Sequence, residues 1–221
     1  MSTQTITSST TPREIPDGLE LIGPIIRLQV QISPLKLGQR PASWYDPAPI
    51  TVVPALRIDP GGIVGLNPDE AHVLHDVHHR DHALTRFRGE NGVSIGFTSH
   101  YLRMQDRFGP HLTLGIAGES IIIDTTRIYS EDDLRAGIVV LGPDGGVHVD
   151  LLQVAAPCVE FSKFAMRYPP DSKADRDVSE ALKFLHQGTR GFYGTYQQSA
   201  DAPSRITTGN LVYRCLPTSE R

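Results

Sequence analysis

The chain has 221 residues, of which 39% are hydrophobic and 21% are charged, so it can build a real core and is not a disordered chain. Its net charge of -4, without a clustered basic run, argues against a nucleic-acid partner, because such proteins gain most of their affinity from phosphate contacts. No segment approaches the roughly 20 apolar residues that span a bilayer, and the Ser/Thr-rich start does not resemble a secretory signal. We therefore expect a cytoplasmic protein without a membrane partner.

The composition also bears on the fold class. Glycine and proline are frequent, with 20 and 17 residues, and long helical patterns are few, which favours a mainly β fold with a few short peripheral helices. Residues 1–20 begin with a Ser/Thr-rich stretch and are predicted to be a flexible arm. Neither an internal repeat nor a linker divides residues 21–215, so we expect a single domain there.

The first strand signal follows the arm. Apolar and polar residues alternate over 26–32, which predicts a half-buried strand. The Pro-rich segment 33–49 predicts a long surface loop, because proline cannot donate to a strand ladder. Residues 50–58 predict a second strand, which ends at the turn signal of residues 59–62.

Three helices are expected further along. A serine at the start and a glycine beyond the end predict a short helix over 99–107. Residues 130–133, a serine and three acids, predict a second helix start, since acidic side chains satisfy the free N–H groups of a first turn. The strongest helical pattern covers 178–187, with Asp177 as its cap and Gly188 after its end.

Two further strands lead to the cysteines. Residues 147–152 form a strand pattern that runs toward Cys158, so this thiol is expected at the end of a strand. Residues 211–215 form the last strand pattern and contain Cys215, which we interpret as structural. Two cysteines cannot form a disulfide framework, and both are expected to be free thiols in a reducing cytosol.

Three segments carry short motifs in a fixed order. Residues 115–120 read Gly-Ile-Ala-Gly-Glu-Ser before three isoleucines, residues 156–158 read Ala-Pro-Cys after a strand, and residues 188–193 read Gly-Thr-Arg-Gly-Phe-Tyr. Together they resemble the MOSC family, the molybdenum-cofactor sulfurase C-terminal domain. A weaker match over 93–101 resembles the strand and helix start that precede the first motif. The resemblance covers about residues 60–213.

The resemblance implies a β-barrel with short helices at its rim and a pocket for molybdopterin. It implies that the sulfur of Cys158 ligates molybdenum or carries transferable sulfur, which requires a thiolate. It further implies that Arg190 binds the anionic cofactor, for which its planar fork of donors is suited. The turn of Gly118, Glu119 and Ser120 is expected to help through backbone N–H groups and the serine hydroxyl.

Residues 72–82 are unusual because they contain five histidines. Neutral imidazole is the commonest metal ligand, so a zinc site is one interpretation. His75 and His79 are four residues apart and would share one face of a helix. However, the segment lacks the glutamate of a His-Glu-x-x-His motif and has no paired cysteines.

In the MOSC family a His-containing loop at about this place lies near the cofactor. We therefore prefer the interpretation that His79, Arg80 and Arg86 form an electropositive rim that faces an anion. A solvated polar loop is the alternative. Lys36, in the Pro-rich segment, is a candidate phosphate contact, because family members often place a lysine there.

The chain also departs from the family pattern. Ser120 stands where the family has asparagine, and Glu160 replaces the basic residue usual two places after the cysteine. Glu90 and Asn91 stand where an Asp-Arg pair is expected. These changes remove positive charge and amide donors, so they affect cofactor binding more than the fold.

The leading functional hypothesis is a molybdenum-cofactor-binding oxidoreductase that reduces N-hydroxylated small molecules, with electrons from separate donor proteins. A second hypothesis is a sulfur-carrier or cofactor-delivery protein with a persulfide on Cys158. A third is a barrel kept as a binding module after loss of its cofactor. The sequence has no nucleophile elbow, phosphate-binding loop or Gly-x-Gly-x-x-Gly, so hydrolase, kinase and dehydrogenase functions have no support.

Overall fold

The computed structural model describes residues 17–39, 42–68, 72–85, 89–90, 92–142, 145–196 and 204–217. Most of the expected N-terminal arm therefore lies outside the described residues. The strands are β1 (Leu19–Gln31), β2 (Lys36–Leu37), β3 (Trp44–Tyr45), β4 (Ile50–Val52), β5 (Ala55–Asp59), β6 (Gly62–Leu66), β7 (Val73–His75), β8 (Val93–Phe97), β9 (Ile121–Ile123), β10 (Ile138–Gly142), β11 (Gly145–Val154), β12 (Phe192–Tyr196), β13 (Ser204–Thr207) and β14 (Leu211–Cys215). The helices are α1 (Thr98–Phe108), α2 (Glu131–Leu134), α3 (Val159–Ala165) and α4 (Arg176–Phe184), which continues into the π-helical turn Leu185–Thr189.

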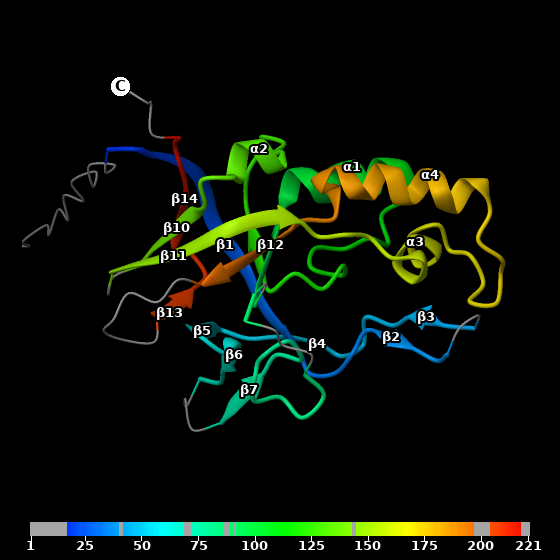
Figure 1. Cartoon of the computed structure of the whole chain (residues 1–221), viewed down its shortest axis with the longest axis horizontal. Helices are drawn as coiled ribbons and strands as arrows, with labels where there is room; N and C mark the ends of the chain where they lie inside the picture. Colours follow the sequence, from blue (N-terminus) through cyan, green and yellow to red (C-terminus); the bar gives the residue numbers. More distant parts are fainter. Residues whose placement is uncertain are drawn as a thin grey trace, which may run out of the picture.

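Seven strands close into a barrel (Figure 1). Around the ring the order is β1, β14, β10, β11, β12, β8 and β9, and β9 pairs with β1 to complete the circle. All neighbours are antiparallel except β8 and β9, which run parallel. The expected mainly β fold, with a barrel and a few short helices, is confirmed. Closure leaves no open sheet edge within the ring.

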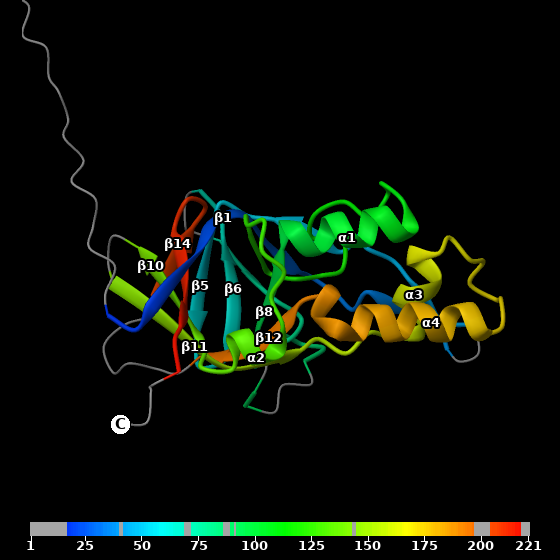
Figure 2. The ribbon, with the colours of Figure 1, turned by 90° about the horizontal axis from the view of Figure 1, so that it is seen from above.

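A second sheet, in the order β13, β5, β6 and β7, lies against the barrel (Figures 1 and 2). Its apolar side chains pack into the same buried cluster as those of the barrel strands. The cluster unites Leu56, Ile58 and Ile206 of the small sheet with Leu28 and Ile95 of the barrel. The two sheets therefore share one hydrophobic core.

The first strand is longer than predicted and contains a β-bulge. The pairing of β1 with β9 shifts between Ile25 and Arg27, so Ile25 is buried (1% exposed) whereas Ile26 points outward (41% exposed). Leu28 and Val30 then face the barrel core as the alternation predicts. The opposite face of this end of β1 is also buried, which the half-buried pattern did not predict.

The segments on either side of the first loop differ from their predictions. The expected surface loop 33–49 contains the hairpin of β2 and β3, and Tyr45 within it is buried. The expected strand 50–58 is two strands, because Pro54 separates β4 from β5. Proline has no N–H for the ladder, so each strand pairs with a different neighbour on its side of the break.

The predicted helices are present, but two of their caps are wrong. Ser130 caps α2 and forms a reciprocal pair with Asp133, as the acidic first turn suggested. Ser99 does not cap α1; its hydroxyl donates to the carbonyl of Arg127 instead. The strongest helix starts earlier than predicted, because Asp175 rather than Asp177 accepts the hydrogen bond of the capping position.

Helices α1, α3 and α4 lie together at one end of the barrel (Figures 1 and 2). Between them and the barrel lies a second apolar cluster, which includes Tyr101 and Met104 of α1, Phe161 of α3 and Ile122 of β9. Ile122 belongs to this cluster, whereas its neighbours Ile121 and Ile123 belong to the barrel core, because side chains alternate along a strand. All three sequence motifs contribute to this second cluster or border it.

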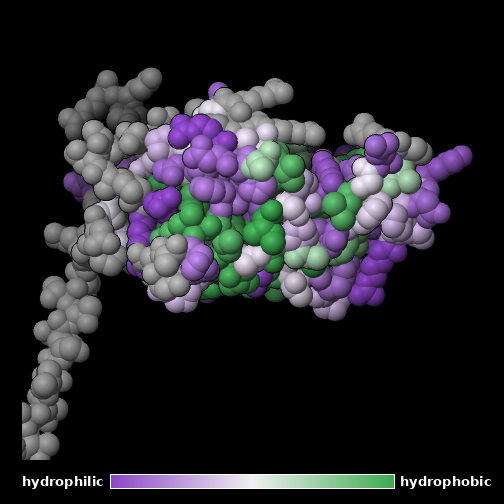
Figure 3. Space-filling view, turned by 90° about the horizontal axis from the view of Figure 1, so that it is seen from below, coloured by the Kyte–Doolittle hydropathy of each residue, from purple (hydrophilic) through white to green (hydrophobic). Residues whose placement is uncertain are grey.

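Some apolar side chains are exposed. Figure 3 shows a patch of them on the face seen from below, which is the side of the small sheet in Figure 1. Ile26, Val52 and Val73 are exposed and belong to neither apolar cluster. No helix among the described residues is long and apolar enough to cross a membrane.

Candidate functional site

Cys158 lies at the start of α3, in contact with the second apolar cluster. Strand β11 ends at Val154, so the cysteine is not at the tip of the strand as predicted, but four residues further on. It is the N-terminal cap of α3, and its Sγ accepts a hydrogen bond of 3.4 Å from the backbone N–H of Phe161. The thiol is free and half-buried. A local turn of helix therefore fixes the direction of the sulfur.

Arg190 follows the π-helical turn and is close to the same helix. Its Cζ lies 5.4 Å from the centre of the Phe161 ring, a cation–π contact. Its Nη2 donates to the carbonyl of Ala117 at 3.0 Å, and its Nη1 donates to the hydroxyl of Tyr193 at 3.3 Å. Phe161 thus contacts both Cys158 and Arg190. Arg190 also contacts the first motif, through the carbonyl of Ala117.

Arg190 remains charged although it is half-buried and its Nε is inaccessible to solvent. Burial acts to lower the pKa of Arg190, but Tyr193, Tyr45 and Glu119 nearby raise it overall. The Nε of Arg190 is buried and has no hydrogen-bond partner among the described residues. A buried donor without a partner costs about 1–3 kcal/mol, so this nitrogen lacks an acceptor that a buried donor normally has.

Glu119 is buried near Arg190. Its Oε2 accepts a hydrogen bond of 2.6 Å from the hydroxyl of Tyr101, and both side chains are buried. Burial raises the pKa of Glu119, although the Tyr101 hydroxyl and Arg190 oppose this. Its Oε1 has no hydrogen-bond partner among the residues that the structure describes. Glu119 therefore orients the turn and adds a second buried polar atom without a partner.

Two glutamines of β1 hold the first motif in place. Gln29 Nε2 donates to the carbonyl of Gly115, and Gln31 Nε2 donates to the carbonyl of Gly118, both at 2.7 Å. Both glutamines are on the buried outer face of the barrel. Their amides explain why polar side chains are tolerated there, since buried polar groups need partners.

The N–H groups expected to bind an anion are engaged within the protein. The N–H of Gly118 donates to the carbonyl of Gly115, and the N–H of Ser120 donates to the carbonyl and hydroxyl of Ser94. The hydroxyl of Ser120 also lies 3.1 Å from that of Ser94. This turn therefore contributes to the site mainly through Glu119 and the carbonyl of Ala117.

Glu160 is buried beside Cys158, and its partner Lys36 is exposed. Glu160 Oε1 accepts a hydrogen bond of 2.8 Å from the hydroxyl of Ser43, and its Oε2 lies 4.0 Å from Lys36 Nζ. Burial acts to raise the pKa of Glu160, but its own N–H, Ser43, Cys158 and Lys36 together hold that pKa below its usual value. Glu160 is thus an anion beside Cys158, and Lys36 balances its charge.

The sequence did not single out three tyrosines of the site, which are Tyr45, Tyr101 and Tyr193. Tyr45 packs edge-on against Phe161 at 5.0 Å, and its hydroxyl donates to the carbonyl of Ile116 at 2.7 Å. Burial raises the pKa of Tyr45. The charges of Glu119 and Cys158 act in the same direction, and the charge of Arg190 opposes them. The signals in the sequence were an aromatic pair in the Pro-rich segment, which contains Tyr45, the weaker match over 93–101, which ends at Tyr101, and the third motif, which ends at Tyr193.

The histidine segment lies in β7 and the turns that follow it, so the helical arrangement of His75 and His79 is wrong. His79 is buried, and its Nε2 lies 3.1 Å from Asp59 Oδ1. Arg80 is exposed, with its Nε 3.6 Å from Asp81 Oδ1. Carboxylates therefore surround the two residues that we expected to face an anion. Arg86 and Asn91 lie outside the described residues.

The segment nevertheless reaches the first motif indirectly. The carboxylate of Asp76 accepts from the backbone N–H of Gln31 at 2.8 Å, and the N–H of Val77 donates to the carbonyl of Gln31. The side chain of Gln31 in turn holds Gly118. The two predicted parts of the site are thus connected through β1.

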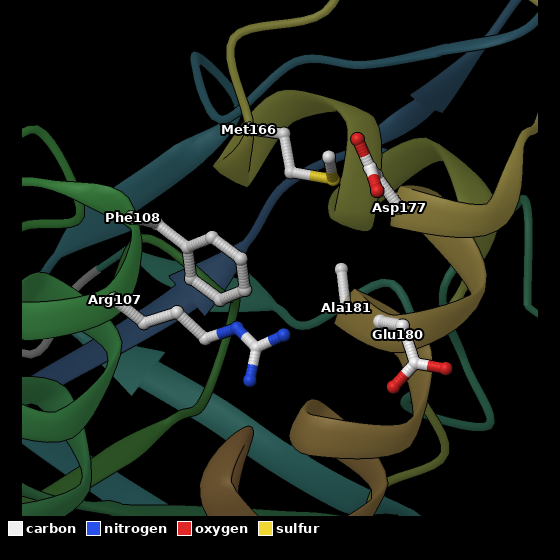
Figure 4. A pocket seen from close by; sticks show the side chains of 6 residues that line it. All are labelled: Arg107, Phe108, Met166, Asp177, Glu180 and Ala181. Atoms are coloured by element: carbon white, nitrogen blue, oxygen red, sulfur yellow. The ribbon is translucent and has the colours of Figure 1, made fainter.

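A groove of about 330 Å³ lies between α1 and α4 (Figure 4). Figure 4 shows the guanidinium of Arg107 and the carboxylates of α4 around its opening. Its lining residues are Arg107, Phe108, Met166, Asp177, Glu180 and Ala181. Neither Cys158 nor Arg190 lines it, so this groove is separate from the region around the thiol.

Comparison with known proteins adds little to the functional question. No family model matches the chain, and no curated protein matches it. The chain is similar to the solved structure of the YUAD protein from Bacillus subtilis, with a TM-score of 0.46 and 14% identity over 86% of this chain and 96% of that one. It is also similar to a structure described as a hypothetical protein, with a TM-score of 0.49 and 13% identity over 89% of this chain and 69% of that one.

Proposed function

We propose that the chain is a molybdenum-cofactor protein of the MOSC type in which Cys158 is the metal ligand. The observation that carries this proposal is that Phe161 contacts both residues: its backbone N–H donates to Sγ of Cys158, and its ring packs against the guanidinium of Arg190. Thiolate is a soft ligand suited to molybdenum, and arginine is suited to the oxygen atoms of a pterin or phosphate. The three motifs that resemble the MOSC family supply these two residues and the turn that Arg190 contacts.

The buried polar atoms of the region are compatible with such a group. The unpartnered Nε of Arg190 offers a donor, and the unpartnered Oε1 of Glu119 offers an acceptor to an N–H group of a pterin edge. Lys36, whose side chain is 56% exposed, is placed to approach a phosphate from solvent. When bound, the cofactor would supply two-electron reduction of N-hydroxylated small molecules, with electrons from separate donor proteins.

A sulfur-carrier function is the second candidate. The half-buried thiol of Cys158 is held by one backbone N–H group, and a carrier needs no phosphate site. The carboxylate of Glu160 beside the thiol and the internally bonded N–H groups of Gly118 and Ser120 favour this function over tight binding of an anionic cofactor. The same features would suit a barrel that serves as a binding module.

Chemical analysis of the purified protein distinguishes these functions. The full chain should be isolated from a host that makes the molybdenum cofactor, together with Cys158→Ala and the matched control Cys215→Ala. Near-stoichiometric molybdenum and pterin that are lost in Cys158→Ala and kept in Cys215→Ala would support the proposal. Sulfane sulfur on Cys158 without metal would support the carrier. Finding neither metal, pterin nor sulfane sulfur would leave the binding module.

A further inference from the structure

A second group of metal-ligating side chains lies away from the thiol, in the turns after β7. The ligand atoms of His75, His79 and Asp81 all lie within 4.8 Å of one another. The two imidazole rings are tilted relative to each other, with centroids 4.6 Å apart and an interplanar angle of 30°. His79 is buried, whereas the side chain of Asp81 is 59% exposed. One ligand is thus fixed in the protein, and another can adjust to an incoming ion.

The hydrogen bonds of His79 set which of its nitrogens can bind a metal. Its Nε2 lies 3.1 Å from Asp59 Oδ1, and its Nδ1 accepts from the backbone N–H of Asp81 at 3.1 Å. This arrangement puts the proton on Nε2 and the lone pair on Nδ1, the side of the Asp81 carboxylate. A carboxylate behind a histidine is the usual outer partner of a metal-binding imidazole, because it fixes the tautomer and the ring orientation.

The charges around this group favour a cation. Asp59 and Asp81 both lie within 4.0 Å of the His79 ring nitrogens. The two arginines nearby contact the carboxylate oxygens that are not the ones paired with His79: Arg57 lies 3.9 Å from Asp59 Oδ2, and Arg80 lies 3.6 Å from Asp81 Oδ1. Asp81 Oδ2 is the oxygen that faces His79. An anion at this place would meet two carboxylates.

We propose that Nδ1 of His79, one ring nitrogen of His75 and the carboxylate of Asp81 bind one divalent transition-metal ion, with Zn²⁺ as the first candidate. Two imidazoles and a carboxylate are a common zinc ligand set, and a water from the exposed side would complete a tetrahedron. Bonds of about 2.0–2.1 Å place the ligand atoms about 3.4 Å apart, so side-chain shifts of about 1 Å close the site. The ion would replace the hydrogen bond from the Asp81 N–H.

Such an ion would fix the turns that follow β7. These turns contact β1 through Asp76 and Gln31, and Gln31 holds Gly118. The ion would therefore stabilise the support of the first motif without contact to Cys158. The proposal is independent of the function assigned to the thiol.

Titration of the chelator-treated full chain, prepared without a histidine tag, tests the site. We expect one Zn²⁺ per chain by calorimetry, and with Co²⁺ the visible absorption of a four-coordinate ion. His75→Gln and Asp81→Asn should each weaken binding at least tenfold. His78→Gln is the matched control, because His78 is in the same turns but pairs with Asp76. Asp59→Asn should weaken binding about 10- to 100-fold, as loss of an outer-shell partner does.

Two results would overturn the proposal. One is a wild-type chain that binds neither Zn²⁺ nor Co²⁺ at 100-fold molar excess. The other is a variant series in which His78→Gln weakens binding as much as His75→Gln, while circular dichroism shows that both variants are folded. A chain with both Cys158→Ala and Cys215→Ala should keep its Zn²⁺, which separates this site from any metal held by a thiol.

Discussion

Tyr101 on helix α1 donates a hydrogen bond of 2.6 Å to Glu119, the acidic residue of the first motif. The same hydroxyl accepts the backbone N–H of Ala117 at 3.1 Å. Because all of these atoms are buried, one hydroxyl satisfies two groups that water cannot reach. The helix thereby fixes the turn whose Ala117 carbonyl holds Arg190.

We predict that Tyr101→Phe destabilises the fold by at least about 2 kcal/mol, because it leaves the N–H of Ala117 and the carboxyl of Glu119 without this partner. Urea unfolding of the full chain measures the loss. Tyr168→Phe is the control, since among the described residues its hydroxyl interacts only with exposed carboxylates, Asp177 at 3.3 Å and Asp175, which water can solvate in its place. This control should change stability by less than about 0.5 kcal/mol. Equal losses in the two variants would contradict the role assigned to Tyr101.

The sequence could identify the parts of this region that are local motifs. Cys158, Arg190 and Glu119 each lie in a short pattern, and the structure brings them around Phe161 and Tyr45. Tyr45 itself could not be predicted, because it comes from a Pro-rich segment with no periodic pattern. Its hydroxyl meets a carbonyl 71 residues further along the chain. A contact that depends on long-range folding leaves no sign in either segment alone.

The turn of the first motif has no room for a side chain at Gly118. This residue has a φ of +93°, and a Cβ there would lie 2.8 Å from Gln31 Nε2 and 2.8 Å from Leu35 Cδ1. Gly118→Ala should therefore cost the strain of a left-handed alanine and, in addition, about 1–3 kcal/mol from overpacking. The matched control is Gly209→Ala, where φ is +85° and no atom of the described residues lies within 4 Å of the new Cβ.

Thermal or urea unfolding of both glycine variants gives the difference. The control carries only the backbone strain, so the excess loss in Gly118→Ala reports the packing against Gln31 and Leu35. An excess near zero would mean that these two side chains move aside at no cost. In that case the glutamine would not hold the motif as rigidly as its 2.7 Å hydrogen bond suggests.

The sequence predicted element boundaries wrongly in two situations: where two residues could each cap the same helix, and where a proline interrupts a strand pattern. Asp175 and Asp177 are both good caps by type, and the structure selects Asp175 because its Oδ1 reaches the N–H of Val178 at 3.0 Å. Apolar residues continue on both sides of Pro54, which hides the change of neighbour between β4 and β5. The barrel class was predictable because it follows from many short strand signals and turn residues together.

His100 is a buried histidine with both nitrogens engaged. Its Nδ1 donates to the carbonyl of Gly188 at 3.0 Å, and its Nε2 accepts the backbone N–H of Tyr129 at 3.1 Å. Burial lowers the pKa of His100 from 6.5 to about 4, although the bond to Gly188 opposes this. The folded chain therefore keeps this ring neutral at pH values where the unfolded chain protonates it.

We predict that this difference makes the fold less stable as the pH falls from 6.5 to 4. In that window the unfolded state binds the proton and the folded state does not, so the loss attributable to His100 reaches about 3 kcal/mol near pH 4 and levels off below it. Urea unfolding at several pH values should show a shallower acid dependence in His100→Gln. The exposed His148→Gln should keep the wild-type slope, and an identical slope in all three proteins would exclude His100 as the cause.

A substitution at Glu160 tests whether an anionic cofactor binds beside Cys158. At neutral pH this carboxylate is charged, because its pKa is held below the usual value despite burial. Ser43 can still donate to a glutamine at this position, and the exposed Lys36 loses a partner at 4.0 Å that contributes little to stability. Glu160→Gln should therefore fold normally and present a net positive charge next to the thiol.

If the cofactor carries a phosphate near Lys36, Glu160→Gln should retain several times more pterin per chain than the wild type during gel filtration in 0.5 M NaCl. Lys36→Met should retain less pterin, because it leaves the negative charge of Glu160 without its positive partner. Glu180→Gln is the control for net charge, since Glu180 pairs with Lys183 on α4 and leaves Cys158 untouched. Retention that rises equally in both glutamine variants would reflect overall charge, and retention that is unchanged in Glu160→Gln would place the anion away from this edge of the site.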